Sequence, residues 1–422
     1  MAVTAAVVAG TLGWIGVVAI GRQLAAATPS NLGFDFEILL KAGRALTEGR
    51  SPYAPELVSG TAPTATHLFY SYPPPVAQAM AVLVWLPSVA ALVVWSLVAV
   101  GGLLAVAEGL RRHYAPDRSR FEVLTVTAAI APLTLPFAVG LLFGNYDVLF
   151  PLLYGAMLLA VVAPTRTSTL AGGAALVVAS LKVHPVSMGL WFLVRVLRER
   201  RDRRDRSSTG PHSDGPPDGS ARILAAAVGI GLAVIASSVV LGGTGIWADY
   251  AKVIGAGTRA VIVDSRNAGI AALVAAFVGG GDDLARMLHL AVGAGALVVT
   301  AWAAWRRADT LESFAWATAA SLVTLPVTWY HYPSAMIPIA IAAGLRAEGA
   351  SARPVRALLI AAGVVAAIAI AALPLVYVAI GLVIAAARRS GEASPVEIRP
   401  VRSPAGQPAR DPAPVPDVPA GG

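Results

Sequence analysis

The chain has 422 residues, of which 56% are hydrophobic and only 13% are charged, and its mean hydropathy is +0.69. Because soluble globular proteins carry about 25% charged residues, this composition excludes a soluble domain and predicts an all-α protein that crosses the membrane repeatedly. The net charge of +8 comes almost wholly from arginines in short segments between apolar stretches, so it indicates membrane topology and excludes nucleic acid as a partner.

The first apolar stretch, residues 2–20, is long enough to cross a hydrocarbon core of about 30 Å. No positive charge precedes it, so we expect a retained span; a signal peptide cleaved near residues 24–27 is the alternative. In either case the polar segment that follows, residues 22–72, forms an external loop.

Residues 35–48 of this loop repeat their apolar side chains with a helical period. They predict an amphipathic helix that lies on the membrane surface. Glu37 with Lys41, and Arg44 with Glu48, are spaced for ion pairs along this helix.

The rest of the chain alternates apolar stretches with short polar segments, and we expect 10 to 12 spans in total, with the N-terminus and the tail in the cytoplasm. Some stretches are too short to span alone and predict re-entrant or interrupted segments, namely 76–86, 268–278 and the pair 170–180 and 185–197. A full span is predicted at 88–110. Further crossings are predicted at 123–141, 148–163, 223–241, 284–305, 310–327 and 333–345. Residues 357–387, interrupted at Pro374, predict one or two final spans.

These elements predict one transmembrane domain, residues 1–389. Residues 195–222 carry eight arginines among Asp, Ser, Pro and Gly, which predicts a basic, partly disordered cytoplasmic loop. Residues 242–268 form a second external loop, and the Pro-, Ala- and Gly-rich segment 390–422 predicts a disordered cytoplasmic tail.

Asp35 stands at the start of the predicted amphipathic helix, and two interpretations of it are open. A carboxylate at the membrane face can take a proton from a hydroxyl group as a general base. Asp is also a favoured helix N-cap, which would be a purely structural role. Glu37 is the nearest alternative base, but its spacing to Lys41 favours a structural role.

Five separate loops place polar or aromatic groups on the external side. This favours one composite site there over a carrier, whose polar groups should lie near the bilayer midplane. Lys182 is an ionisable side chain at a broken helix, which favours a functional role; snorkelling to the interface is the alternative. For the other candidates, the alternative is an ordinary role in a turn or an aromatic belt. The candidates for phosphate binding are Lys182, His184, Arg259, Arg266 and His331, and those for other substrate contacts are Tyr72, Asn145, Asp147 and Tyr332.

Missing motifs narrow the function further. There is no P-loop and no G-x-S-x-G turn, which excludes a P-loop ATPase and an α/β-hydrolase. Cysteine is absent and no histidines have the spacing H-x-x-x-H, so we expect no cofactor and no dedicated metal site, although carboxylates could hold a divalent cation. No soluble segment is long enough to bind a nucleotide sugar, so a transferase of this kind would take its donor from the lipid phase.

Five motifs follow one another in the order of a known family. They are Asp35 with its amphipathic helix, Tyr72-Pro-Pro-Pro75, Gly144-Asn145, Leu181-Lys182-Val-His-Pro185 and Trp329-Tyr-His-Tyr332. On these motifs, residues 1–390 resemble glycosyltransferase family 87, the polyprenyl-phosphate-sugar-dependent enzymes of the GT-C superfamily. That family includes actinobacterial α-mannosyl- and arabinofuranosyltransferases of cell-envelope glycolipids.

The resemblance implies a GT-C fold and an inverting transfer on the periplasmic side of the inner membrane. It also implies that Asp35 is the catalytic base, that Lys182 lies near the donor phosphate and that His331 is the late histidine of the family. We therefore expect an α-mannosyltransferase that uses polyprenyl-phosphate-mannose and a glycolipid or lipoglycan acceptor. The alternatives are an arabinofuranosyltransferase, a flippase for a lipid-linked sugar, and a structural partner in a cell-wall complex.

Overall fold

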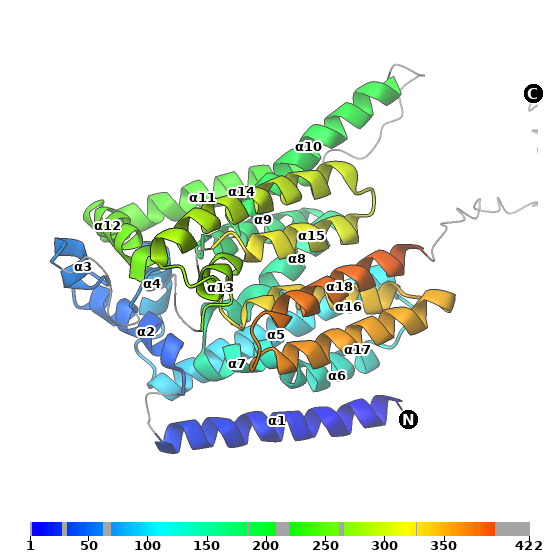
Figure 1. Cartoon of the computed structure of the whole chain (residues 1–422), viewed down its shortest axis with the longest axis horizontal. Coiled ribbons are helices and arrows are strands. Elements are labelled where there is room, and N and C mark those ends of the chain that lie inside the picture. Colours follow the sequence, from blue (N-terminus) through cyan, green and yellow to red (C-terminus); the bar gives the residue numbers. More distant parts are fainter. Residues whose placement is uncertain are drawn as a thin grey trace, which may run out of the picture.

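The structure is a computed structural model that describes residues 2–27, 32–61, 69–183, 185–207, 219–260, 266–325 and 327–392. Within these ranges every regular element is a helix, and most of the helices run alongside one another in a bundle (Figure 1). The fold class predicted from composition, an all-α membrane protein with several spans, is confirmed.

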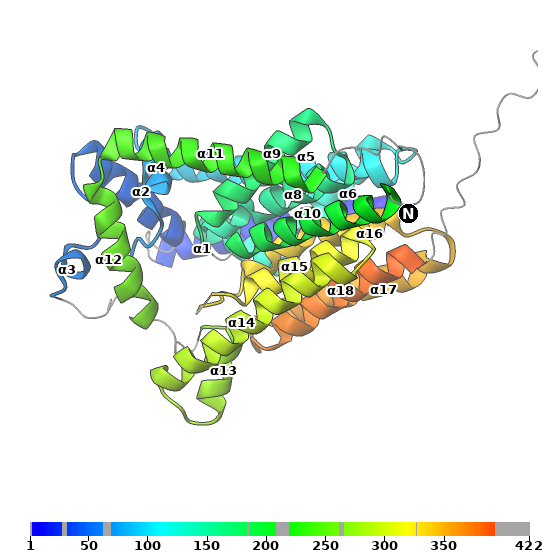
Figure 2. The same cartoon turned by 90° about the horizontal axis from the view of Figure 1, so that it is seen from above.

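The two ends of the bundle carry different elements. Four short helices and the start of α13 gather at one end, while the N-terminus and the ends of α10 and α18 lie at the other (Figures 1 and 2). The short helices are α2 (Phe34–Thr47), α3 (Pro55–Ser59), α4 (Pro74–Ala81) and α12 (Gly245–Ala260), and α13 is Ile270–Phe277.

The bundle itself contains the remaining α-helices and the short 3₁₀ connections. Its α-helices are α1 (Ala2–Ala27), α5 (Ser88–Tyr114), α6 (Arg120–Ile130), α7 (Leu135–Phe143), α8 (Phe150–Val162), α9 (Arg166–Ser180), α10 (Val186–Ser207), α11 (Gly219–Gly242), α14 (Asp282–Arg306), α15 (Thr310–Leu322), α16 (Ile337–Arg346), α17 (Ala352–Ile368) and α18 (Leu375–Glu392). The 3₁₀-helices are η1 (Ala131–Leu133), η2 (Tyr146–Leu149), η3 (Tyr332–Met336) and η4 (Gly349–Ser351).

Four of the described helices are long and apolar enough to cross a membrane, and the bent pair α6 and α7 could add a fifth span. The four are α5, α11, α14 and the stretch Gly349–Ile368, which includes α17. Several other bundle helices are shorter than the 18 residues of this criterion, so the total of 10 to 12 spans stays a prediction.

The predicted span 123–141 is not one continuous helix. It is divided into α6 and α7, which meet at an angle of 71° across η1. Pro132 and Pro136 lie at this junction and lack the backbone N–H that continues a helix, so the interior hydrogen bonds are interrupted there.

Two segments predicted as polar loops, 195–222 and 242–268, contain more helix than the sequence suggested. Residues 195–207, expected in the basic loop, extend α10, and residues 219–222 begin α11. Ion pairs of i,i+4 spacing support this extension, among them Arg195 with Glu199 and Arg201 with Asp205. Likewise, α12 occupies most of the second external loop. Residues 390–392 belong to α18, and the predicted disordered tail beyond them lies outside the described residues.

The amphipathic helix predicted at residues 35–48 is confirmed as α2, which packs its apolar face on α4. A Cβ atom on Gly43 would lie 2.7 Å from the backbone at Met80, so the absence of a side chain permits this close approach. The two expected ion pairs, Glu37 with Lys41 and Arg44 with Glu48, are absent from α2, whose residues are all described. Glu48 instead pairs with Arg50 after the chain turns at the end of the helix.

Candidate functional site

Five polar side chains from four separated segments meet at the end of the bundle that carries α2 and α4. Asp35 comes from the first turn of α2, and Asn145 and Asp147 come from the turn at η2. Lys182 follows α9, and His331 precedes η3. The structure therefore brings together residues that the sequence separates by up to about 300 positions.

Two glycines permit α2 to approach η2. Gly33 and Gly144 adopt φ values of +69° and +63°, which side chains rarely tolerate. The N–H of Gly33 donates to the carbonyl of Leu142 at 2.8 Å, and a Cβ on Gly144 would lie 2.5 Å from Cβ of Phe36. The N-cap of α2 is Gly33, so the interpretation of Asp35 as the N-cap is wrong; Asp35 is the second residue of the helix.

Asp147 is the centre of the charged group. Its side chain is fully buried and forms an ion pair with Lys182, while His331 Nε2 lies 3.0 Å from its Oδ2. Burial alone would raise the pKa of Asp147, but Lys182 and His331 outweigh it and hold that pKa below its ordinary value. The surroundings thus favour the charged form of Asp147, whose Oδ1 has no hydrogen-bond partner among the described residues.

Asn145 links this group to Asp35. Its Nδ2 donates to Oδ2 of Asp35 at 2.8 Å. Its Oδ1 accepts a hydrogen bond from Lys182 Nζ at 3.3 Å and another from the backbone N–H of Asp147 at 3.0 Å.

Two tyrosine rings enclose the Lys182 ammonium. Its Nζ lies 4.6 Å from the centre of the Tyr332 ring and 5.7 Å from that of Tyr72. Burial raises the pKa of both phenols, and the charge of Asp147 raises it further, so both stay neutral donors. Tyr72 and Tyr332, candidates for substrate contact, thus lie against the candidate phosphate-binding lysine.

The break between α9 and α10 is strained where it presents Lys182. Val183 has a φ of +69°, and a β-branched residue adopts this conformation only when its surroundings impose it. Such strain is typical of functional sites, and here it directly follows the lysine.

No described contact places the other three predicted phosphate-binding residues in this group. Arg266 is exposed, and its guanidinium lies 5.6 Å from the centre of the Trp329 ring. Arg259 belongs to α12, but its side chain is not among the described atoms, and His184 lies outside the described residues.

Sequence reasoning missed a continuous run of aromatic side chains, called here the aromatic chain. It connects α12 in the second external loop to the site and to α5, with ring centres 5.4 to 6.2 Å apart. Short motifs such as Phe69-Tyr-Ser-Tyr72 hint at aromatic clustering, but its partners come from distant segments. In order the members are Trp247, Tyr250, Tyr53, Tyr70, Tyr72, Tyr146 and Trp95.

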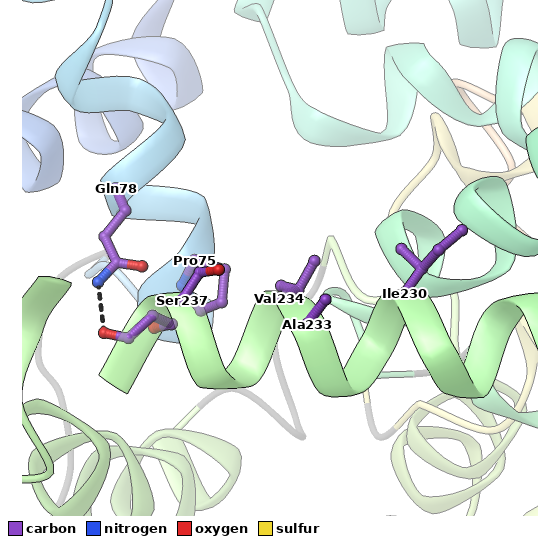
Figure 3. A pocket seen from close by; sticks show the side chains of 7 residues that line it. Pro75, Gln78, Ile230, Ala233, Val234 and Ser237 are labelled. Carbon is purple, nitrogen blue, oxygen red and sulfur yellow. Dashed lines mark hydrogen bonds between the residues drawn. The ribbon is translucent and has the colours of Figure 1, made fainter. Parts of the chain in front are cut away.

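A groove of about 320 Å³ lies between α4 and α11 (Figure 3). Gln78 donates to the carbonyl of Ser238 at 2.9 Å and ties the two helices together at one end. One wall of the groove is α11, a helix long and apolar enough to cross a membrane. Its lining is mostly apolar and consists of Pro75, Gln78, Ile230, Ala233, Val234, Ser237 and Ser238.

No group of three or more histidine or acidic side chains among the described residues is arranged to hold a metal ion. The described site instead offers a proton acceptor, Asp35, and a cation, Lys182, that are joined through Asn145. A buried lysine and histidine can stabilise a developing anion such as a phosphate.

The fold and this site define a membrane protein with several spans and a mostly enclosed polar site at one end of its bundle. The chain matches the model of glycosyltransferase family 87 over residues 70–329, more than half of its length, and it belongs to that family. It is therefore a membrane glycosyltransferase, which requires a sugar donor and an acceptor. No curated protein and no solved structure matches the chain. The matched segment includes Asn145, Asp147 and Lys182, whereas Asp35 and His331 lie outside it.

Replacing Gly144 by alanine is expected to reduce sugar transfer at least tenfold and to destabilise the protein by about 2–4 kcal/mol. The new Cβ would overlap Phe36 at 2.5 Å and push α2, with Asp35, away from Asn145. Thermal unfolding and transfer rates of the purified variant measure both effects.

Gly101→Ala is the matched control, because a Cβ at this helical position in α5 would meet nothing within 4 Å. We expect it to leave stability and transfer close to wild type. Equal losses in the two variants would contradict the argument from close packing.

Proposed function

We propose that this glycosyltransferase moves mannose from a polyprenyl-phosphate donor to a glycolipid or lipoglycan acceptor on the periplasmic face of the inner membrane, with inversion at the anomeric carbon. The observation that carries the proposal is the placement of Asp35 and Lys182 on opposite ends of the Asn145 side chain. Asp35 can accept a proton, Lys182 can attract a phosphate, and the side-chain amide of Asn145 contacts both.

The chemistry follows from these two groups. Asp35 takes the proton of the acceptor hydroxyl while its oxygen attacks the anomeric carbon from the face opposite the phosphate. The bond from that carbon to the phosphate oxygen breaks, and its electron pair stays on the leaving polyprenyl phosphate. Lys182 and His331 stabilise the added negative charge, and this stabilisation is strong because both side chains are about nine-tenths buried.

A lipid-linked donor is supported by the groove between α4 and α11. Its apolar lining suits an isoprenoid chain (Figure 3). Pro75 in this lining follows Tyr72, whose ring faces Lys182, by three residues along the chain. A donor with its chain in this groove could place its phosphate near Lys182.

The distribution of arginine supports an outward-facing site. Basic residues end α5, α14 and α18, and arginines fill the end of α10, all at the end of the bundle opposite α2, α3 and α12 (Figure 1). Under the positive-inside rule the arginine-rich end faces the cytoplasm, so Asp35 and Lys182 would face the periplasm.

The proposal is tested by transfer of radiolabelled sugar with the purified enzyme in lipid vesicles that contain extracted cell-envelope glycolipids. Polyprenyl-phosphate-mannose is expected to label the glycolipid, whereas a mannose nucleotide is expected to give no product. Product from polyprenyl-phosphate-arabinofuranose alone would replace mannose by arabinose. Product from the nucleotide would overturn the lipid donor, and donor that crosses the vesicle membrane without transfer would identify a carrier.

A further inference from the structure

The side chain of Asn145 uses both of its ends inside the protein. The residue is buried, its Nδ2 donates to Asp35, and its Oδ1 accepts from Lys182 and from the backbone N–H of Asp147. Among the described residues, Asn145 is the one side chain that donates a hydrogen bond to Asp35. With both ends engaged, this amide has little capacity left to bind a sugar, which is the role that the sequence suggested.

The chemistry of the partners fixes the direction of the amide. The Lys182 ammonium and the Asp147 N–H can only donate hydrogen bonds, so they must face the carbonyl oxygen of the amide. A flipped amide would set its NH₂ group against these donors and its oxygen against the carboxylate of Asp35. The NH₂ group is therefore held toward Asp35.

We infer that Asn145 is a positioning residue that orients the Asp35 carboxylate for proton transfer, an inference that rests on the function proposed above. Its Nδ2 binds Oδ2 of Asp35 and leaves Oδ1 to take the acceptor's proton. In the transfer step that proton moves to Asp35 Oδ1, the acceptor oxygen bonds to the anomeric carbon, and the electron pair of the broken bond goes to the phosphate.

The same amide keeps its direction while the donor binds. The Lys182 ammonium has three N–H groups, and two of them donate to Asn145 and Asp147. The third can donate to an incoming phosphate without releasing Asn145. The backbone N–H of Asp147 also donates to Asn145 Oδ1, and Ser334 donates to the Asp147 carbonyl at 3.1 Å and ties η2 to η3. Asp35 thus stays oriented while the donor phosphate binds.

The test compares Asn145→Ala and the near-isosteric Asn145→Asp with wild type. Both remove the donor to Asp35, and Asn145→Asp also adds a negative charge beside Asp35 and Asp147. We expect kcat to fall about 10- to 100-fold, the size seen when partners that orient a metal ligand are removed, while KM for the polyprenyl-phosphate donor changes less than threefold.

Asn267→Asp is the matched control for a buried asparagine with a structural role. Oδ1 of Asn267 accepts from the backbone N–H groups of Gly269 and Thr328, at 2.8 and 2.9 Å, and Asp can still accept both. The substitution buries a new charge, so it should lower the melting temperature and leave kcat and donor KM close to wild type.

An Asn145 variant with an unchanged kcat and a raised donor KM would overturn the positioning role and favour direct substrate binding. If Asn145→Ala does not fold, the test rests on Asn145→Asp. If wild type itself transfers no sugar from a polyprenyl-phosphate donor, the proposed function fails, and this inference falls with it. Transfer by wild type together with a normal kcat in the variants overturns the inference alone.

Discussion

Sugar transfer by an Asp35→Asn variant is expected to fall about 10³-fold, within the range for loss of a general base. Asparagine has nearly the same shape, and its oxygen can still accept from Asn145 Nδ2, so the fold should be retained. The reduction should lie in kcat, with little change in KM for the donor, because the role proposed for Asp35 is to take a proton from the acceptor. Steady-state rates with polyprenyl-phosphate-mannose and a thermal unfolding curve check both parts.

Glu37→Gln is the control for this experiment. It removes the same charge from the same turn of α2, and no described contact joins Glu37 to the site. We expect nearly normal transfer. If Glu37→Gln were the inactive variant and Asp35→Asn active, the base would have to be reassigned to Glu37.

Replacing Lys182 by methionine should have two large effects. The change removes the cation proposed to hold the donor phosphate, so donor KM should rise steeply and product should become barely measurable. It also leaves the fully buried Asp147 with only His331 to compensate its charge. Breaking a buried ion pair in this way typically costs about 3–5 kcal/mol of stability, which a denaturation experiment would show.

The double variant Lys182→Met with Asp147→Asn separates these two effects. Neutralising both partners removes the uncompensated charge, so most of the lost stability should return. Transfer should remain absent, because no cation faces the donor phosphate. Recovery of transfer together with stability would show that Lys182 serves the fold and not the donor.

The elements predicted from sequence are those set by local pattern. The helical period of residues 35–48 predicted α2, and the long apolar runs predicted α5, α11 and α14. The bend between α6 and α7 was missed although Pro132 and Pro136 are visible in the sequence, because hydropathy averages over both residues. The helical end of α10 was missed because its composition, which is rich in Arg and Asp, resembles disorder, whereas the spacing of its charges favours helix.

The candidate site could likewise be predicted only in part from the sequence. Residue type and position on the external side selected Asp35, Asn145, Lys182 and His331, and these residues do meet in the structure. Their roles stay predictions. Sequence could not show that Lys182 and His331 share Asp147 as their partner, because that pairing joins segments up to 184 positions apart.

The aromatic chain gives this enzyme an internal optical reporter. Five neighbouring tyrosines lie between Trp95 and Trp247, so energy absorbed by the phenols can pass to an indole at either end. The Tyr72 ring within this series lies 5.7 Å from Lys182 Nζ. A ligand that draws the ammonium away changes the electric field at that ring, and the emission of the unlabelled protein then reports the occupancy of the site.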